Sequence, residues 1–277
     1  MKITTLAINQ IDSVGRRFFN VIIYTHQLFL MTYLSFRAAI IDQAQGFRTV
    51  YSVVSQQIYF TGVQALPLIT VLSIAAGSVV IMQSSFQLNF FGGQDMIGTL
   101  LVMIIMREIA PLLTALIVIA RSGTAVASEL GNMKVNNEIK ALESMGINPL
   151  SYIVFPRLAG GILSVICLAF YFVLTAFVGG YLITKLIHNM PVTFYINSLA
   201  NAFRATDVIL FISKTTFSGI IIFVVSCFQG LAVQKSPNEV PVATTKAVMN
   251  SIIYVIAFNL IATTAFYLED LMKLGVL

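Results

Sequence analysis

The chain has 277 residues, of which 58% are hydrophobic and 10% are charged, and its mean hydropathy is +0.90. An ordinary soluble domain carries about 25% charged residues, so this composition excludes the common soluble classes and indicates a polytopic membrane protein. The net charge of +5 calls for no nucleic-acid partner, because basic residues next to anionic lipid account for it.

The first 50 residues predict an interfacial N-terminal region. Residues 18–36 carry no charge, but polar side chains recur among them, and arginines flank both ends at Arg16, Arg17 and Arg37. A helix lying in the headgroup plane can keep both basic flanks on one side of the membrane, whereas a spanning helix cannot. We therefore predict an interfacial helix, with a sixth span as the alternative.

Five long apolar runs follow this region. A bilayer core requires about 20 apolar residues per helix, and in hydrocarbon only helices and closed barrels satisfy the backbone hydrogen bonds. The runs show no alternating strand pattern, so the sequence predicts an all-α fold. The predicted transmembrane helices are residues 61–86, 99–121, 157–187, 208–233 and 246–268. Cys167 and Cys227 fall within these spans, and we expect both to be buried apolar residues.

The distribution of basic residues gives the orientation. With five spans and a cytoplasmic N-terminus, eleven of the 16 lysines and arginines lie on the cytoplasmic side, as the positive-inside rule requires. The charged segment between the second and third spans, from Arg121 to Arg157, is then cytoplasmic, and the C-terminus faces outward.

This segment predicts a cytoplasmic helix at residues 124–146, which Gly146 and Pro149 would end. Apolar and charged side chains are interspersed around it, so it could be a solvated helix lying on the bilayer or a coupling helix that docks into a cleft of an ATPase. The candidate ATPase contacts are Glu129, Leu130, Met133, Lys134, Glu138, Lys140, Leu142 and Glu143.

Three charged residues lie inside predicted spans, where each costs about 3 kcal/mol on insertion scales and therefore needs a partner or a wet cavity. Arg107 and Glu108 in the second span and Lys214 in the fourth lie at similar depth, in the outer half of the membrane. We predict a Glu108–Lys214 pair, with Arg107 meeting a lipid phosphate or another carboxylate. Asp207 is expected at an interfacial boundary. The pair could serve folding alone or line a lipid cavity.

The sequence lacks the parts of several enzymes. It contains no zinc-protease HExxH, no hydrolase GxSxG and no Walker A loop. We expect no catalytic residues, no metal site and no cofactor in this chain. If ATP drives the protein, a separate subunit must bind it.

Five motifs carry a resemblance to a known family. In order, they are Arg107-Glu108-x-x-Pro111, Ala120-Arg121-Ser122-Gly123, Glu129-Leu130-Gly131-x-Met133-Lys134-Val135, Ala141-Leu142-x-x-Met145-Gly146-Ile147-x-Pro149 and Pro156-Arg157. Their order and spacing closely resemble the MlaE (YrbE) permeases of ABC systems that work with MCE-domain proteins. The likeness continues through Lys214, Gly230 and Thr244 to Val248 and covers the chain from residue 50 onward.

The resemblance implies that residues 1–277 form a single MlaE-type permease domain of a homodimer in a bacterial inner (cytoplasmic) membrane. The implied partners are a cytoplasmic ABC ATPase, a periplasmic MCE-domain protein and a small STAS-like accessory protein, and the implied cargo is phospholipid or a related lipid. It also implies that residues 124–146 contact the ATPase. The alternative is a secondary transporter or channel with a Glu108–Lys214 relay.

Overall fold

The computed structural model describes residues 2–41, 47–91, 97–188, 191–234 and 236–273, and these residues form helices and short connections without a β-strand. The helices are α1 (Lys2–Ile41), α2 (Phe47–Thr61), α3 (Leu66–Phe91), α4 (Ile97–Leu101), α5 (Ala110–Val118), α6 (Thr124–Val135), α7 (Glu138–Ser144), α8 (Phe155–His188), α9 (Val192–Ala202), α10 (Ala205–Leu231) and α11 (Glu239–Lys273). A 3-10 turn, η2 (Val63–Ala65), and three π-helical segments, η4 (Val102–Ile109), η5 (Ile119–Gly123) and η6 (Leu150–Val154), join them. The all-α fold is confirmed.

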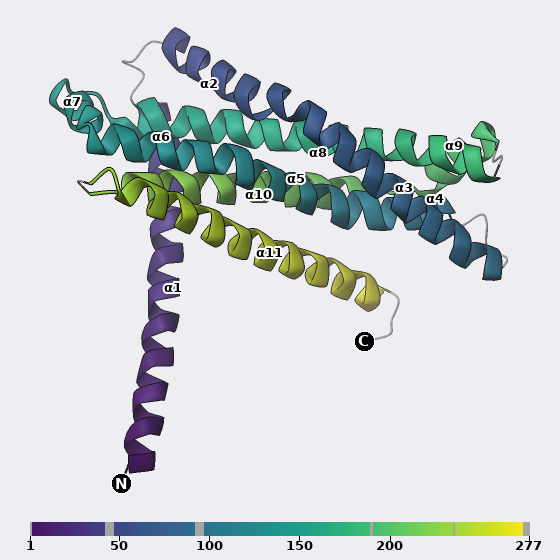
Figure 1. Ribbon diagram of the computed structural model, residues 1–277, viewed down its shortest axis with the longest axis horizontal. Coiled ribbons are helices and arrows are strands. Elements are labelled where there is room, and N and C mark those ends of the chain that lie inside the picture. The colour runs from purple at the N-terminus through teal and green to yellow at the C-terminus, as the bar shows by residue number, and fades with distance from the viewer. Residues whose placement is uncertain (1, 42–46, 92–96, 189–190, 235, 274–277) are drawn as a thin grey trace.

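Five stretches in the described residues are long and apolar enough to cross a membrane, as predicted. They are Tyr51–Ser84, Gly98–Val135, Leu150–Ile183, Ala205–Leu231 and Glu239–Leu268. Each of these stretches contains most of a predicted span. All but the fourth extend well past the predicted boundary on one side, at the end of the bundle where α7 lies (Figure 1). The second span continues there because good helix formers such as Glu129, Met133 and Lys134 follow its apolar part.

The prediction of one separate helix at residues 124–146 is wrong in its boundaries. Residues 124–135 continue the second span without a break, through the π-helical turns of η5 into α6. Asn137 then adopts a left-handed conformation with φ of 59°, and a short helix, α7, follows. Asparagine tolerates this conformation better than most residues, so the helix breaks at the Asn136–Asn137 pair.

The N-terminal helix α1 lies across the bundle at the α7 end, roughly perpendicular to the long helices (Figure 1). Tyr24 fixes it there: its ring packs edge-on against Phe228, and its hydroxyl accepts hydrogen bonds from Gln229 (2.9 Å) and Asn250 (3.3 Å). Burial raises the pKa of Tyr24. The perpendicular direction is the one an interfacial helix would have, and the interfacial placement remains a prediction.

A close helix contact joins α3 to α8. A Cβ atom at Gly77 would overlap the backbone carbonyl of Ala176, so the absence of a side chain allows the backbones to touch. Hydroxyl pairs reinforce the seam on one side, with Ser73 and Thr175 joined at 2.6 Å. Cys227 is buried as expected, but Cys167 is exposed, because it lies on the face of α8 that points away from the bundle.

Candidate intramembrane site and the α6–α7 segment

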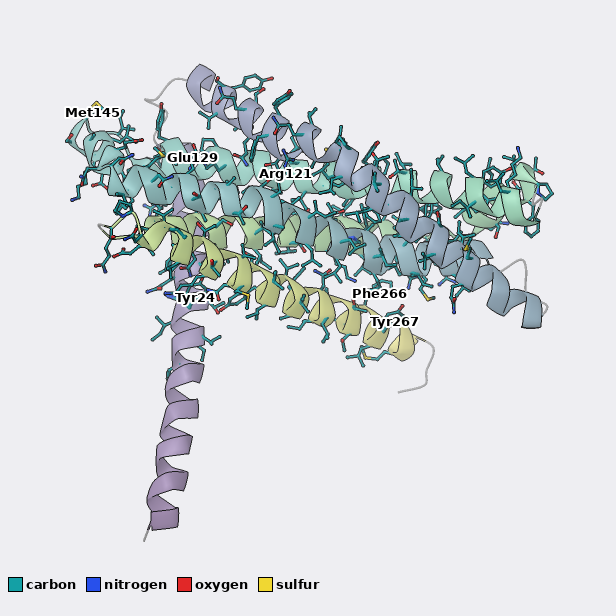
Figure 2. The ribbon with its side chains drawn as sticks, viewed as in Figure 1. Tyr24, Arg121, Glu129, Met145, Phe266 and Tyr267 are labelled. Atoms are coloured by element: carbon teal, nitrogen blue, oxygen red, sulfur yellow. The ribbon has the colours of Figure 1, made fainter. Side chains whose placement is uncertain are left out.

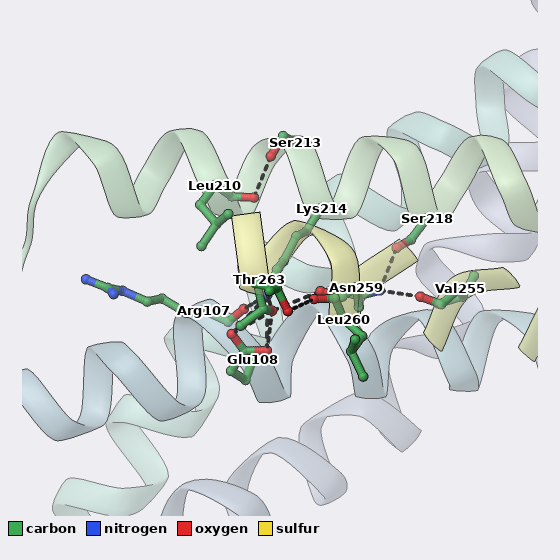
Figure 3. Close-up of polar contacts among 11 residues, drawn as sticks. Arg107, Glu108, Leu210, Ser213, Lys214, Ser218, Val255, Asn259, Leu260 and Thr263 are labelled. Carbon is green, nitrogen blue, oxygen red and sulfur yellow. Dashed lines mark hydrogen bonds and ion pairs between the residues drawn. The ribbon is translucent and has the colours of Figure 1, made fainter. Parts of the chain in front are cut away.

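Lys214 on α10 is the centre of a polar cluster between α10, α11 and the second span (Figure 3). Its side chain is fully buried, and its ammonium donates to the backbone carbonyl of Arg107 (2.8 Å), to both carboxylate oxygens of Glu108 (3.0 Å each) and to the Thr263 hydroxyl (2.7 Å). The predicted Glu108–Lys214 pair is thus present. The three donors of a lysine are all satisfied here, which an intramembrane ammonium requires.

Glu108 remains accessible from one side. Its side chain is 41% exposed, whereas that of Lys214 is fully buried. The hydroxyl of Thr263 lies 3.1 Å from both Glu108 oxygens and 2.9 Å from the backbone carbonyl of Asn259, so its single proton can go to either acceptor. The carboxylate therefore has an inner side held by Lys214 and Thr263 and an outer side open to a ligand.

Arg107 makes a second, separate ion pair. Its Nη2 lies 2.6 Å from Oδ1 of Asp207, and both side chains are buried. The guanidinium also lies over the ring of Phe266, 5.0 Å from its centroid, a distance at which cation–π attraction operates. Of the two predicted partners for Arg107, the structure supplies the carboxylate. Asp207, which we predicted at an interfacial boundary, is 1% exposed and is therefore buried among the helices, while its depth in the membrane stays a prediction.

The local backbone lets two adjacent residues serve two different partners. Arg107 and Glu108 lie in η4, where the π-helical hydrogen-bond pattern inserts extra residues into the turn. Successive side chains on a helix point in different directions, so Arg107 reaches Asp207 while Glu108 reaches Lys214. The Arg107 carbonyl completes the arrangement by accepting from Lys214.

The contribution of α11 to the charged cluster was not predicted from the sequence. Thr263 and Phe266 both contact the charged cluster, and Asn259 donates to Ser218 (3.3 Å) one turn below Lys214. A signal was present, because polar residues at 259 and 263 recur at the four-residue spacing that places them on one helix face. The sequence does not show which helices pack against this face of α11, or in what register, so the contacts of these two polar residues could not be predicted.

The structure divides the predicted ATPase contacts into buried and exposed groups. Leu130 is fully buried, so we remove it from the expected contact surface. It packs inside the chain because α6 continues the second span between α10 and α11. Met133 and Leu142 are half-buried against the core, and Lys134 has intermediate exposure. Glu138, Lys140 and Glu143 are exposed on α7.

The exposure of Met145 and the ion pair of Arg157, both near this segment, were not predicted from the sequence. Met145, at the end of α7, is 64% exposed and lies at the tip of the molecule (Figure 2). Arg157, at the start of α8, is buried, and its Nη2 lies 2.7 Å from Oε1 of Glu129. Glu129 is thus exposed, as a contact residue would be, but it is also paired within its own chain.

Five long apolar helices with paired charges buried among them define a multi-pass membrane protein. A family model described as "Permease MlaE" matches residues 54–265. This chain belongs to the MlaE permease family, which implies a membrane context and an ATPase partner. It is therefore an ABC transporter permease.

Named relatives agree with this assignment. A "Probable ABC transporter permease protein" of Rickettsia typhi is 32% identical over 76% of this chain and 82% of its own. A protein of the same description from Synechocystis is 28% identical over 79% and 81%. "Protein TRIGALACTOSYLDIACYLGLYCEROL 1, chloroplastic" of Arabidopsis thaliana is 26% identical over 76% of this chain and 61% of its own.

An ABC permease does not need an ion relay, so the secondary-transporter alternative is set aside.

Proposed function

We propose that this permease moves phospholipid or a related lipid between a bacterial inner membrane and an MCE-domain protein, with ATP hydrolysed by a separate subunit. The observation that carries the proposal is the half-exposed Glu108 carboxylate, held from behind by the buried Lys214. A polar group at this depth, beside apolar helix faces, suits a molecule with a polar head and apolar tails. The name of one relative also refers to a galactolipid.

We further propose that a second copy of the chain completes the site. The apolar window of α11 is 17% buried, against 39–56% for the other four spans. Large apolar side chains point outward along it, among them Ile253, Leu260 and Ile261. Since Thr263 and Phe266 on the same helix contact the charged cluster, a homodimer packed through α11 would place two such clusters near the interface.

The cytoplasmic end supports the ATPase partnership. Exposed Glu138, Lys140, Glu143 and Met145 lie together on or beside α7, at the tip of the molecule. Methionine is enriched at protein interfaces and interface rims are polar, so an exposed Met145 beside charged side chains suits a protein partner. A STAS-like accessory protein would bind the ATPase side of such a complex, and the MCE-domain protein would bind the α9 end.

The test is lipid transfer by the purified complex. The permease is tagged, isolated with its partners and placed in vesicles containing a fluorescent phospholipid, and transfer to the MCE-domain protein is followed with ATP or with a non-hydrolysable analogue. We expect ATP-dependent transfer, and a phospholipid identified by mass spectrometry in the purified complex. Transfer that proceeds equally with the analogue, or a complex without lipid, would contradict the proposal.

Replacement of the cluster separates a lipid-contacting role from a folding role. Glu108→Gln keeps the shape and removes the charge of the exposed group. Because the change also removes the counter-charge of the buried Lys214, thermal stability and ATPase binding are measured beside transfer. We expect the folded variant to bind the ATPase and to transfer lipid about ten-fold more slowly, as loss of one charged contact of about 1.4 kcal/mol would give; a loss of transfer that only follows a loss of stability would assign the pair to folding. Unchanged transfer would assign the Glu108–Lys214 pair to folding alone.

A further inference from the structure

One ion pair brackets the whole cytoplasmic segment. Glu129 lies on α6, at the end of the second span, and Arg157 lies at the start of α8, where the third span begins; their side chains meet at 2.7 Å. All of α7 and η6 lies between them in the chain. The pair therefore closes the base of a loop whose tip carries Met145 (Figure 2).

The two partners are unequally buried. The side chain of Arg157 is 9% exposed and that of Glu129 is 62% exposed. A second nitrogen of Arg157, Nη1, is buried without a hydrogen-bond partner among the described residues. Glu129 thus neutralises a buried cation, and its removal leaves that cation uncompensated, whereas removal of Arg157 leaves a carboxylate in water.

The loop above the pair is internally fixed. Asn137 and Gly146, at the two ends of α7, have φ of 59° and 75° and set its direction. The amide of Ile147 donates to the carbonyl of Leu142 (3.0 Å), which closes the helix end. Ile139 on α7 is 2% exposed and belongs to the core of the molecule. A displacement of α7 is consequently carried to its two attachments, α6 and α8.

We infer that Glu129 and Arg157 are positioning residues that clamp α6 to α8, so that a movement of α7 reaches the second and third spans together. The inference rests on the proposed function, in which α7 contacts the ATPase. It gives Glu129 a different role from the exposed residues of α7. Those residues hold the partner, and the clamp transmits the partner's movement toward Arg107 and Glu108, which lie on the same continuous helix as Glu129.

The experiment compares Glu129→Ala, Arg157→Ala and the exchange Glu129→Arg/Arg157→Glu in the complete complex in vesicles. Co-purification of the ATPase, ATP hydrolysis and ATP-driven lipid transfer are measured for each. We expect the ATPase to be retained and to hydrolyse ATP, while lipid transferred per ATP falls about three- to thirty-fold in the single variants. The exchange should restore transfer at least partly, and Asn132→Ala, an exposed change on α6, serves as the neutral control.

A distance measurement reports the clamp directly. Spin labels at positions 132 on α6 and 163 on α8, both exposed, are placed in a Cys167→Ser background, because Cys167 is itself exposed. Glu129→Ala should broaden the distance distribution, and Glu129→Asp should keep it narrow. If a single variant does not fold, Glu129→Gln and Arg157→Lys give the same comparison with smaller perturbation.

Each alternative has its own signature. Release of the ATPase by Glu129→Ala, without rescue by the exchange, would make Glu129 a direct contact and overturn the clamp. Unchanged transfer and unchanged label distances would make the pair an inert surface contact. A wild-type complex without an ATPase or without ATP-dependent transfer would refute the proposed function, while the label distances would still report whether the pair holds α6 to α8.

Discussion

The second span carries charge at both of its ends, and the two groups are organised in opposite ways. Toward its N-terminal end, Arg107 and Glu108 are paired with Asp207 and Lys214, and three of these four side chains are buried. Around and beyond its C-terminal end, the charges of α7 are exposed, and Arg157 is the buried cation, with Glu129 as its partner. In lipid a charge must be neutralised within the chain, whereas in water it can stay available to a partner.

The difference shows where each region can act. The charged cluster around Lys214 is closed except at Glu108, so a ligand can approach it from one side. The α7 surface is open, and its role depends on what binds there. The following predictions test whether this division holds.

The largest effect is expected at the Arg107–Asp207 pair. Asp207→Leu leaves Arg107 buried without its carboxylate, which should lower the free energy of unfolding by about 3–5 kcal/mol. Thermal unfolding of the purified protein in detergent measures the loss. The double variant Arg107→Met/Asp207→Leu should recover most of it, because an apolar pair of similar volume needs no neutralisation. A double variant as unstable as the single one would show that the pair is not the cause.

Leu130→Ala tests the boundary between the two regions. Leu130 is fully buried, so its truncation should cost about 2–5 kcal/mol in unfolding free energy through lost packing and a cavity. Denaturation of the isolated permease gives the value, with Met145→Ala as the exposed control expected to show no change. A stable Leu130→Ala protein that fails to bind the ATPase would return Leu130 to the contact surface.

Substitution of two glycines compares the cost of disturbing helix packing in the span with the cost of a strained loop conformation. Gly77→Ala places a Cβ atom against the Ala176 backbone and should cost about 1–3 kcal/mol by separating α3 from α8. Gly146→Ala meets no atom within 4 Å and is opposed by its φ of 75° alone, which costs about 1 kcal/mol. Unfolding of the two variants is compared under the same conditions, and a larger cost at Gly146 would reverse the assignment.

Tyr24→Phe tests how α1 is held to the bundle. Loss of the hydrogen bonds from Gln229 and Asn250 should cost about 1 kcal/mol, seen as faster hydrogen exchange in α1, with the exposed Tyr33→Phe as control. Burial raises the pKa of Tyr24 above 10.0. The stability that comes from burying the neutral Tyr24 side chain is therefore fully present below pH 10.0 and is lost as the pH rises through the raised pKa. A wild-type minus Tyr24→Phe difference that is unchanged in strong alkali would contradict this assignment.

The smallest effect on the isolated chain is expected at Met145. Met145→Ser removes an exposed apolar contact, so the unfolding free energy should not change. Affinity for the ATPase should fall about five-fold, as loss of about 1 kcal/mol would give. Titration of the ATPase against permease in nanodiscs measures it, and unchanged affinity would exclude the tip of α7 from the interface.

Part of the charged cluster around Lys214 could be predicted from the sequence, and part could not. Long apolar runs predicted the five spans. Glu108 and Lys214 lie at similar depth in their spans, and because a charge in lipid needs a partner, this predicted that the two side chains meet. The burial of Asp207 was not predicted, because a position near the end of a span suits both an exposed and a buried residue. The contacts of Thr263 and Phe266 with the cluster depend on the register between α10 and α11, which no local sequence pattern gives.

Composition, span length and the cost of isolated charges were sufficient to define an all-α membrane protein with an intramembrane ion pair, since these quantities depend on the local chain and the surrounding solvent. The tertiary structure decided that α6 continues the second span, that Leu130 is a core residue and that Glu129 pairs with Arg157. These outcomes depend on which helices lie side by side, and only packing of the whole chain determines that.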